Sequence, residues 1–231
     1  MFDRAFEKLE RIVVFRFQLF GQEVNISDTL FVTWLVIAFL IVFTFFATRK
    51  LSVDKPNRFQ VLLEWLVSSI DGMCQSSIGE HGRKFLPYLG SLILFLGVGN
   101  IIAAFNFIPG LELYPPAKDI NTTAPLALMS MIVVLYSSFR YKGVKGWLKS
   151  FVDPMAMMAP FKLMEYATKP LSLCLRLFGN VLAGFLIMEI ILSLAPLAAA
   201  PFSAYFDIAD GILQAFIFVY LTSLYIGEAV E

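Results

Sequence analysis

One arginine lies inside an apolar run, where a charged side chain is costly. Arg176 falls within residues 170–195, a run whose only other charged residue is Glu189. An arginine at the centre of a membrane helix costs about 2.5–17 kcal/mol, depending on how water and lipid respond to it. Arginine cannot escape that cost by losing its proton. Arg176 therefore reaches back to the membrane surface, pairs with an acid, or faces a wet or protein-lined path.

Polar and small side chains share a helical face with this arginine. At about 100° per residue, Ser172, Arg176, Asn180 and Gly184 follow one another at four-residue steps and form a narrow stripe. Ala183 lies within the same stripe. Small residues allow another helix to approach closely in lipid. An ordinary helix–helix seam would explain the amide and the small residues, but it does not explain the arginine.

Carboxylates form the second group of candidates. Glu189 lies about 20 Å further along the same helix than Arg176, so a direct ion pair is impossible if the helix is regular. In the last apolar run, Asp207 and Asp210 precede Gln214 by seven and four residues, which places the three near one face. A short turn between the two helices would bring Glu189 near Asp207. Carboxylates inside membranes often belong to proton relays, although Asp207 and Asp210 also fit an interfacial loop.

Composition indicates where these groups lie. Of the 231 residues, 58% are hydrophobic and 16% charged, and the 18 basic and 18 acidic residues give no net charge. A soluble domain is about a quarter charged, so we predict an integral membrane protein. The zero net charge argues against a nucleic-acid binder and against an acidic disordered tail. Cys74 and Cys174 are far apart and His81 is the single histidine, so neither a metal site nor a cofactor is expected.

The apolar runs predict an all-α integral membrane protein with a single membrane domain over 1–231. A bilayer crossing needs about 20 apolar residues. Five runs approach or exceed that length: 30–47, 85–108, 120–139, 170–195 and 211–227. The last two should form an antiparallel hairpin joined by the apolar turn 195–201. Asn121, Thr122 and Thr123 are candidate caps of the third helix.

Two further segments are predicted to lie at the membrane surface. Residues 57–77 have apolar residues at helical spacing with Glu64 and Asp71 on the polar side, which indicates an interfacial helix. The N-terminal segment 1–28 is charged throughout its first half and does not resemble a signal peptide. We expect it to be interfacial, with Phe6, Leu9 and Val13 on one face.

Basic residues predict the orientation. Positively charged loops stay on the inner side. The loops after the first and third spans, and the segment before the second, carry Arg49, Lys50, Lys55, Arg58, Arg83, Lys84, Arg140, Lys142, Lys145 and Lys149. The loop between the second and third spans has only Lys118 against Glu112 and Asp119. We therefore expect the N-terminus outside and the C-terminus inside.

Three sequence segments, in order, resemble one family. Residues 169–184 (KPLSLCLRLFGNVLAG) closely resemble the signature of subunit a of F-type ATP synthases. Residues 121–128 (NTTAPLAL), preceded by PPAKD, are similar to the segment that opens that family's third span, and residues 213–225 (LQAFIFVYLTSLY) are similar to its final helix. The resemblance covers most of the chain from about residue 56.

The resemblance implies roles for individual residues. Arg176 matches the arginine that faces the ion-carrying carboxylate of the passing c subunit, and Gln214 matches the glutamine that faces this arginine. Asn180 and Gly184 match the rest of the signature. The family often has a carboxylate or histidine at the position of Phe185, paired with an acid or histidine at that of Asp207. We hypothesise that Glu189, one turn further along the helix, replaces this carboxylate as the acid of the outer half-channel. The half-channel and supporting set is completed by Ser172, Asp119, Asn121 and Asp210.

The resemblance also implies partners and location. The chain would be a non-catalytic stator channel that passes H⁺ or Na⁺ to and from the c-ring. It would assemble with peripheral-stalk subunit b and the rest of the synthase in a bacterial plasma membrane, without nucleic acid. No GxxxxGK[ST] loop is present for ATP chemistry. A stand-alone secondary transporter or channel, and a purely structural membrane subunit, are the alternatives. The sequence lacks the internal repeat common among transporters.

Overall fold

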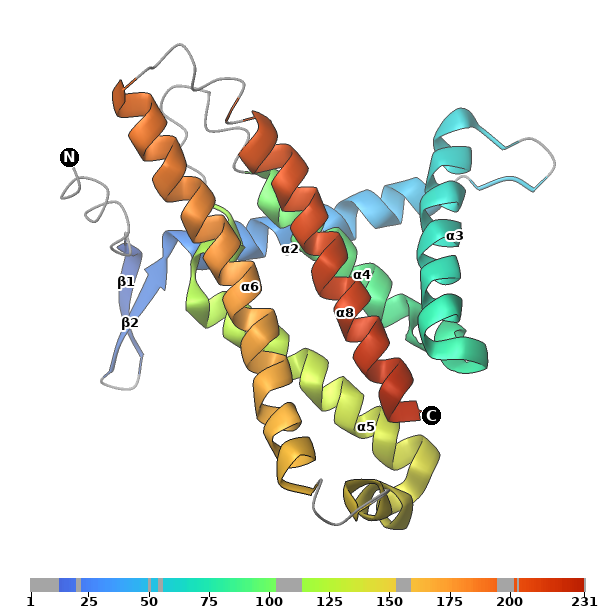
Figure 1. Ribbon diagram of the computed structural model, residues 1–231. Coiled ribbons are helices and arrows are strands. Elements are labelled where there is room, and N and C mark those ends of the chain that lie inside the picture. The colour runs from blue at the N-terminus through green and yellow to red at the C-terminus, as the bar shows by residue number, and fades with distance from the viewer. Residues whose placement is uncertain are drawn as a thin grey trace. The chain divides into compact units, whose positions relative to one another are not determined.

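The structure of the protein is a computed structural model that describes residues 13–19, 22–49, 51–53, 56–102, 114–152, 159–194, 202 and 204–230 (Figure 1). It divides into two compact units. The first unit comprises Met1–Thr44, Leu94–Thr123 and Leu177–Ala215, and the second comprises Phe45–Ile93, Ala124–Arg176 and Phe216–Glu231. The elements are, in order, β1 (Val13–Leu19), β2 (Gln22–Ser27), α2 (Asp28–Thr48), α3 (Arg58–Ile78), η1 (Gly79–His81), α4 (Gly82–Ile101), η3 (Pro116–Lys118), α5 (Ile120–Val152), α6 (Ala159–Leu194), η5 (Ala204–Asp210) and α8 (Gly211–Val230).

The membrane part of the described chain is all-α, as predicted. Within the part of the chain that the structure describes, five helical stretches are long and apolar enough to cross a membrane: Asp28–Thr48, Arg58–Ile101, Ile120–Ser150, Ala159–Leu194 and Ile208–Val230. Backbone polar groups in lipid must be satisfied within the protein, and a helix does this by itself. The predicted helix over 57–77 is present as α3, and its position at the membrane surface stays a prediction.

Local sequence signals set several helix ends. The Ser27 hydroxyl accepts a hydrogen bond from the Leu30 amide at the start of α2. Asp119 caps α5, because its carboxylate accepts from the Asn121 amide at 2.9 Å. The cap thus lies two residues before Asn121, which was among the candidate caps. Gly79 ends α3 with φ of 74°, a left-handed conformation that favours glycine, and its amide donates to the Gln75 carbonyl.

The N-terminal segment contains a β-hairpin that the sequence analysis did not anticipate. β1 and β2 pair antiparallel, with Leu19 opposite Gln22 and Phe17 opposite Val24. Val13 therefore begins a strand and does not continue a helical face. Apolar and polar residues alternate along FRFQL and EVNI, the period of a strand. Phe6 and Leu9 lie outside the described residues.

Two membrane helices are longer than their apolar runs. α5 continues to Val152, with a break at Gly143, where φ is 69°. α6 begins at Ala159, so Pro170 lies inside the helix and does not open it. Charged residues end an apolar run without ending a helix, so both helices extend beyond the predicted spans, whose bounds in the membrane stay a prediction. Residues 103–108 of the predicted second span and the turn over 195–201 lie outside the described residues.

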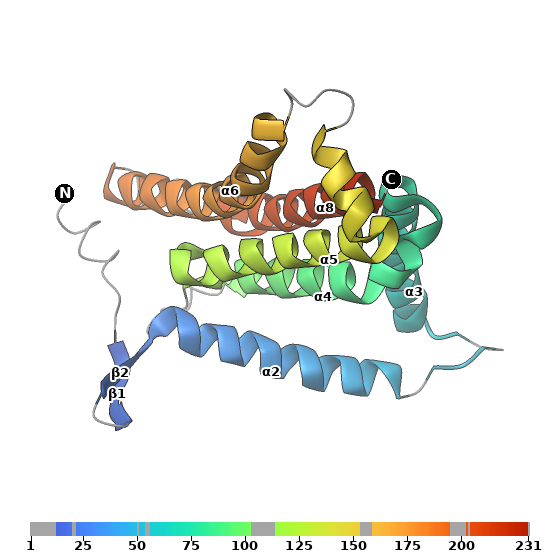
Figure 2. The same cartoon turned by 90° about the horizontal axis from the view of Figure 1, so that it is seen from below.

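Each unit has its own packing. In the first unit, Val32 and Val36 of α2 form a buried cluster with Ile102. In the second unit, where α4 and α5 run alongside one another (Figure 2), the Tyr88 and Ser130 hydroxyls are hydrogen-bonded at 3.0 Å. Small hydroxyl residues are buried here with bonds to their own helices, and they allow close helix packing. These residues are Ser130, Ser137, Thr222 and Ser223.

Candidate functional site

The stripe around Arg176 lies on a poorly covered helix. Only 12% of an 18-residue apolar stretch of α6 is buried in the chain. Arg176 itself is half-buried, whereas Ser172, Asn180 and Ala183 are exposed and Gly184 is half-buried. Within the described part of the chain, no carboxylate pairs with Arg176. The stripe is thus a surface that carries a cation with no carboxylate partner among the described residues.

A hydrogen bond connects the same stripe to α8 within the first unit. The Asn180 amide nitrogen Nδ2 donates to Oε1 of Gln214 at 2.6 Å. Gln214 is 1% exposed, and its Nε2 atom has no hydrogen-bond partner among the described residues. A buried donor without a partner costs about 1–3 kcal/mol. Gln214 is therefore a buried amide whose oxygen is satisfied and whose NH₂ group is available for a further interaction.

The acids near the start of α8 lie in an unusual helical segment. Asp207 and Asp210 belong to η5, a π-helix, which is rare and occurs often at functional sites. Asp210 is half-buried, and the side chain of Asp207 lies outside the described part. The Asn100 amide donates to the Gly211 carbonyl at 3.2 Å, and both residues are buried. Asn100 thereby fixes the backbone that follows Asp210.

Asp119 has a structural role that is visible in the first unit. Its Oδ1 atom accepts from both the backbone amide and the side-chain amide of Asn121. Its Oδ2 atom accepts from the Thr29 hydroxyl at 3.2 Å, which joins the start of α2 to the start of α5. Asp119 and Asn121 are therefore brought together as a cap.

An ammonium group lies beside Phe185, the position where the sequence resemblance led us to expect a carboxylate or histidine. Nζ of Lys118 is 3.5 Å from the ring centroid of Tyr114 and 4.2 Å from that of Phe185. The two rings meet edge to face at 6.1 Å. Aromatic faces attract cations, so this part of the first unit holds a positive charge. Glu189 lies in α6 four residues further, and its side chain is outside the described part.

The structure thus brings some of the predicted residues together and leaves others untested. Asn180 is hydrogen-bonded to Gln214, while the expected proximity of Glu189 and Asp207 stays a prediction. Sequence reasoning missed Asn100 as a supporting residue, although an amide inside an apolar span was a usable signal. It counted Lys118 only as a loop charge. Among the described residues, no group of three His, Cys, Asp or Glu side chains is arranged to hold a metal ion.

Comparisons with known proteins agree with the resemblance of the sequence segments. The model of the family described as ATP synthase A chain matches residues 30–227. The chain is 35% identical over 217 residues to the sodium ion specific ATP synthase subunit a of Propionigenium modestum, covering 89% of this chain and 74% of that protein. It is 38% identical over 208 residues to ATP synthase subunit a 2 of Bradyrhizobium sp. (strain BTAi1), covering 90% of each. Identity to ATP synthase subunit a 1 of Crocosphaera subtropica is 30% over 211 residues, covering 91% and 90%.

Proposed function

Because the chain belongs to the ATP synthase A chain family, we propose that it is the stator channel subunit of an F-type ATP synthase. It would offer two offset half-channels that carry H⁺ or Na⁺ to and from carboxylates of a rotating c-ring. The observation that carries this proposal is Arg176, half-buried on a poorly covered face of α6 and without an ion pair in the described part of the chain. We place the protein in a bacterial plasma membrane, with the N-terminus outside, the C-terminus inside, and subunit b as a further partner.

The arginine accounts for ion release from the ring. A cation close to a carboxylate favours its ionised form, so a loaded c-ring carboxylate loses its ion as it passes Arg176. The same charge repels an ion that would slip directly between the half-channels. The membrane potential supplies about 2.3 kcal/mol per charge per 100 mV. Rotation driven in this way would power ATP synthesis on other subunits, and this chain would have no active site of its own.

The remaining stripe residues support this contact. Ser172, Asn180 and Gly184 would let the ring approach closely, and Gln214 would hold Asn180 from α8. Glu189, Asp207 and Asp210 would line the outer half-channel, while Asp119 and Asn121 cap α5 beside it. If Glu189→Gln left ion-driven ATP synthesis unchanged while Asp207→Asn abolished it, Glu189 would not be the replacement for the acid absent at Phe185.

ATP-driven ion pumping tests the proposal. Inverted membrane vesicles containing the whole synthase with Arg176→Ala should hydrolyse ATP without acidifying or loading their interior. Arg83→Ala is the matched control, because Arg83 is 78% exposed beside Asp71 and should leave pumping intact. Normal pumping by Arg176→Ala would refute the role. Vesicles with this chain alone should move no ions, and transport by the chain alone would favour a secondary transporter. The dependence of ATP hydrolysis on Na⁺ would identify the ion.

A further inference from the structure

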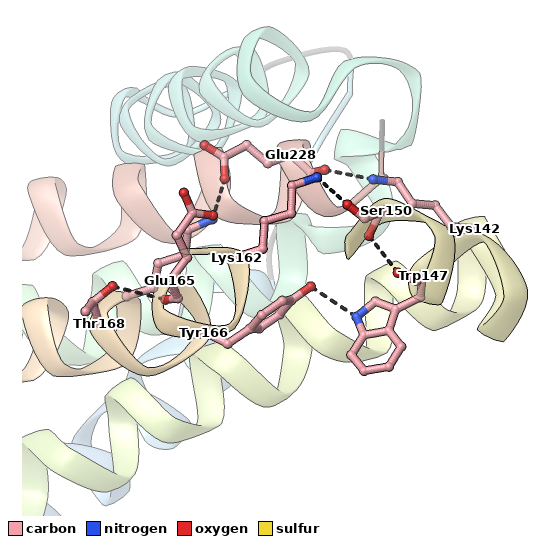
Figure 3. A network of polar contacts seen from close by, with 9 residues as sticks. Lys142, Trp147, Ser150, Lys162, Glu165, Tyr166, Thr168 and Glu228 are labelled. Atoms are coloured by element: carbon pink, nitrogen blue, oxygen red, sulfur yellow. Dashed lines mark hydrogen bonds and ion pairs between the residues drawn. The ribbon is translucent and has the colours of Figure 1, made fainter. Parts of the chain in front are cut away.

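A basic pocket opens in the second unit, apart from the Arg176 stripe. It has a volume of about 200 Å³ and lies between the end of α5, the start of α6 and the end of α8. Figure 3 shows the polar network around it. Its charged lining residues are Lys142, Lys162, Lys169, Glu165 and Glu228. The volume is below the roughly 300–1,000 Å³ of sites for drug-sized ligands, so the pocket suits a small polar group.

The three lysines are anchored around this pocket by protein contacts. Lys142 donates to the backbone carbonyl of Glu228 at 3.1 Å, and Lys162 donates to the carbonyl of Ser150. Lys169 donates to the Glu228 carboxylate at 2.5 Å. These contacts hold the ammonium groups in place, so a ligand would meet a preformed cluster.

The charge of the lining favours an anion. Among the described residues that line the pocket, three lysines face two glutamates, an excess of one positive charge. The side chain of Lys169 is 21% exposed, whereas those of Glu165 and Glu228 are each 61% exposed. The carboxylates are therefore better solvated and more strongly screened than this ammonium group.

The surroundings indicate a ligand that is also apolar. Trp147 donates its indole N–H to the Tyr166 hydroxyl at 3.0 Å beside the pocket, and such aromatic residues concentrate at membrane surfaces. The same helix segments expose Val144 (61%), Leu148 (56%) and Phe161 (66%). The basic residues near this end of α5 predict that it lies at the inner surface. Basic pockets between membrane helices on that side bind lipid head groups.

We propose that this pocket binds the phosphate group of an anionic phospholipid of the inner leaflet. The lysines would contact the phosphate oxygens, and the exposed apolar residues would contact the acyl chains. The shared chemistry, a phosphate group among ammonium groups, also fits free inorganic phosphate, which the experiment separates from lipid. The inference does not depend on the function proposed for Arg176.

Lipid retention by the full chain tests the inference. The purified chain in nanodiscs or detergent is offered phosphatidylglycerol, phosphatidylcholine or inorganic phosphate, and bound molecules are counted by native mass spectrometry. We expect phosphatidylglycerol to be retained over phosphatidylcholine. At roughly a fivefold gain per lysine, the Lys142→Gln/Lys162→Gln pair should weaken this binding about 30-fold.

Two further variant pairs control for charge and folding. Lys145→Gln/Lys149→Gln removes equal charge from the same helix outside the pocket lining and should retain the lipid, and Lys142→Arg/Lys162→Arg should bind nearly as well as the unaltered chain. Equal retention of phosphatidylcholine, equal losses in both Gln pairs, or displacement of the lipid by inorganic phosphate would overturn the proposal. The comparison of the two lipids on the unaltered chain decides the matter even if a variant fails to fold.

Discussion

Helices α6 and α8 are both long and apolar, yet the chain covers them to different degrees. In an 18-residue apolar stretch of each, 12% of α6 is buried against 39% of α8. α8 buries Thr222 and Ser223, whose hydroxyls bond to carbonyls of their own helix. α6 instead leaves Ser172 and Asn180 exposed around Arg176. The difference shows that α8 packs within this chain, whereas the polar face of α6 is left open for the partner subunit that we propose.

Arg176→Lys should produce the largest effect. The ammonium group lacks the planar fork of arginine and can lose its proton when desolvated. We expect ion-driven ATP synthesis to fall roughly tenfold or more, which corresponds to at least about one pKa unit of lost carboxylate stabilisation. Lys169→Arg, a charge-preserving change in the same helix, is the control and should synthesise ATP normally. Equal rates of ATP synthesis by Arg176→Lys and Lys169→Arg would contradict a special requirement for arginine on the exposed face of α6.

Replacing one glycine of each helix with alanine should change the free energy of unfolding differently in α8 and in α6. A Cβ atom at Gly227 of α8 would lie 2.1 Å from the Ser77 carbonyl oxygen, while one at Gly179 of α6 would meet nothing within 4 Å. Gly227→Ala should therefore lower the free energy of unfolding by about 3 kcal/mol, the upper end for overpacking. Gly179→Ala should leave it unchanged or raise it by up to about 1 kcal/mol through helix propensity. Unfolding in mixed micelles measures both, and a reversed order would contradict the comparison.

The Asn180–Gln214 hydrogen bond should give a moderate effect, because it is where the two helices meet in the first unit. A double-mutant cycle with Asn180→Ala and Gln214→Ala should show a coupling energy of about 1 kcal/mol in stability. Thr222→Ala combined with Asn180→Ala provides the control pair and should be additive. A coupling near zero for Asn180 and Gln214 would mean that the 2.6 Å contact does not stabilise the chain.

The smallest effect on stability is expected for the ion pair between Lys169 of α6 and Glu228 of α8. Lys169 of α6 contacts the Glu228 carboxylate, which is 61% exposed. Exposed ion pairs contribute about 0–1 kcal/mol and weaken with salt. Lys169→Gln should accordingly lower stability by less than about 1 kcal/mol, and the loss should shrink as the salt concentration of the unfolding assay rises. A larger, salt-independent loss would show that this contact is more than a surface ion pair.

Sequence reasoning predicted the helical elements well, for physical reasons. A bilayer crossing needs a long apolar helix, so hydropathy was sufficient to predict the spans, and helical periodicity was sufficient to predict α3. It did not predict the extension of α6 back to Ala159, because charged residues at a membrane surface do not end a helix. The β1–β2 hairpin was also missed, since its alternating pattern is short and only its first residue, Val13, was assigned to a face of an interfacial segment.

The candidate site was predictable where one helix sets the geometry. The stripe of Ser172, Arg176 and Asn180 follows from helical spacing alone. The contact between Asn180 and Gln214, and that of Lys118 with the Phe185 ring, depend on how separate elements pack. One-dimensional patterns do not specify such packing. For the same reason the partnership of Glu189 with Asp207 stays a prediction.

Site-specific photo-crosslinking in the intact synthase tests the central claim most directly. A photoreactive residue replaces Ala183, which is exposed on the Arg176 stripe, and in a matched variant it replaces Ile41, which is 64% exposed on α2. The account predicts that position 183 crosslinks to the c subunit and that position 41 does not. Absence of a crosslink from 183 to the c subunit, with a crosslink from 41 in its place, would contradict the claim that the Arg176 face of α6 meets the ring.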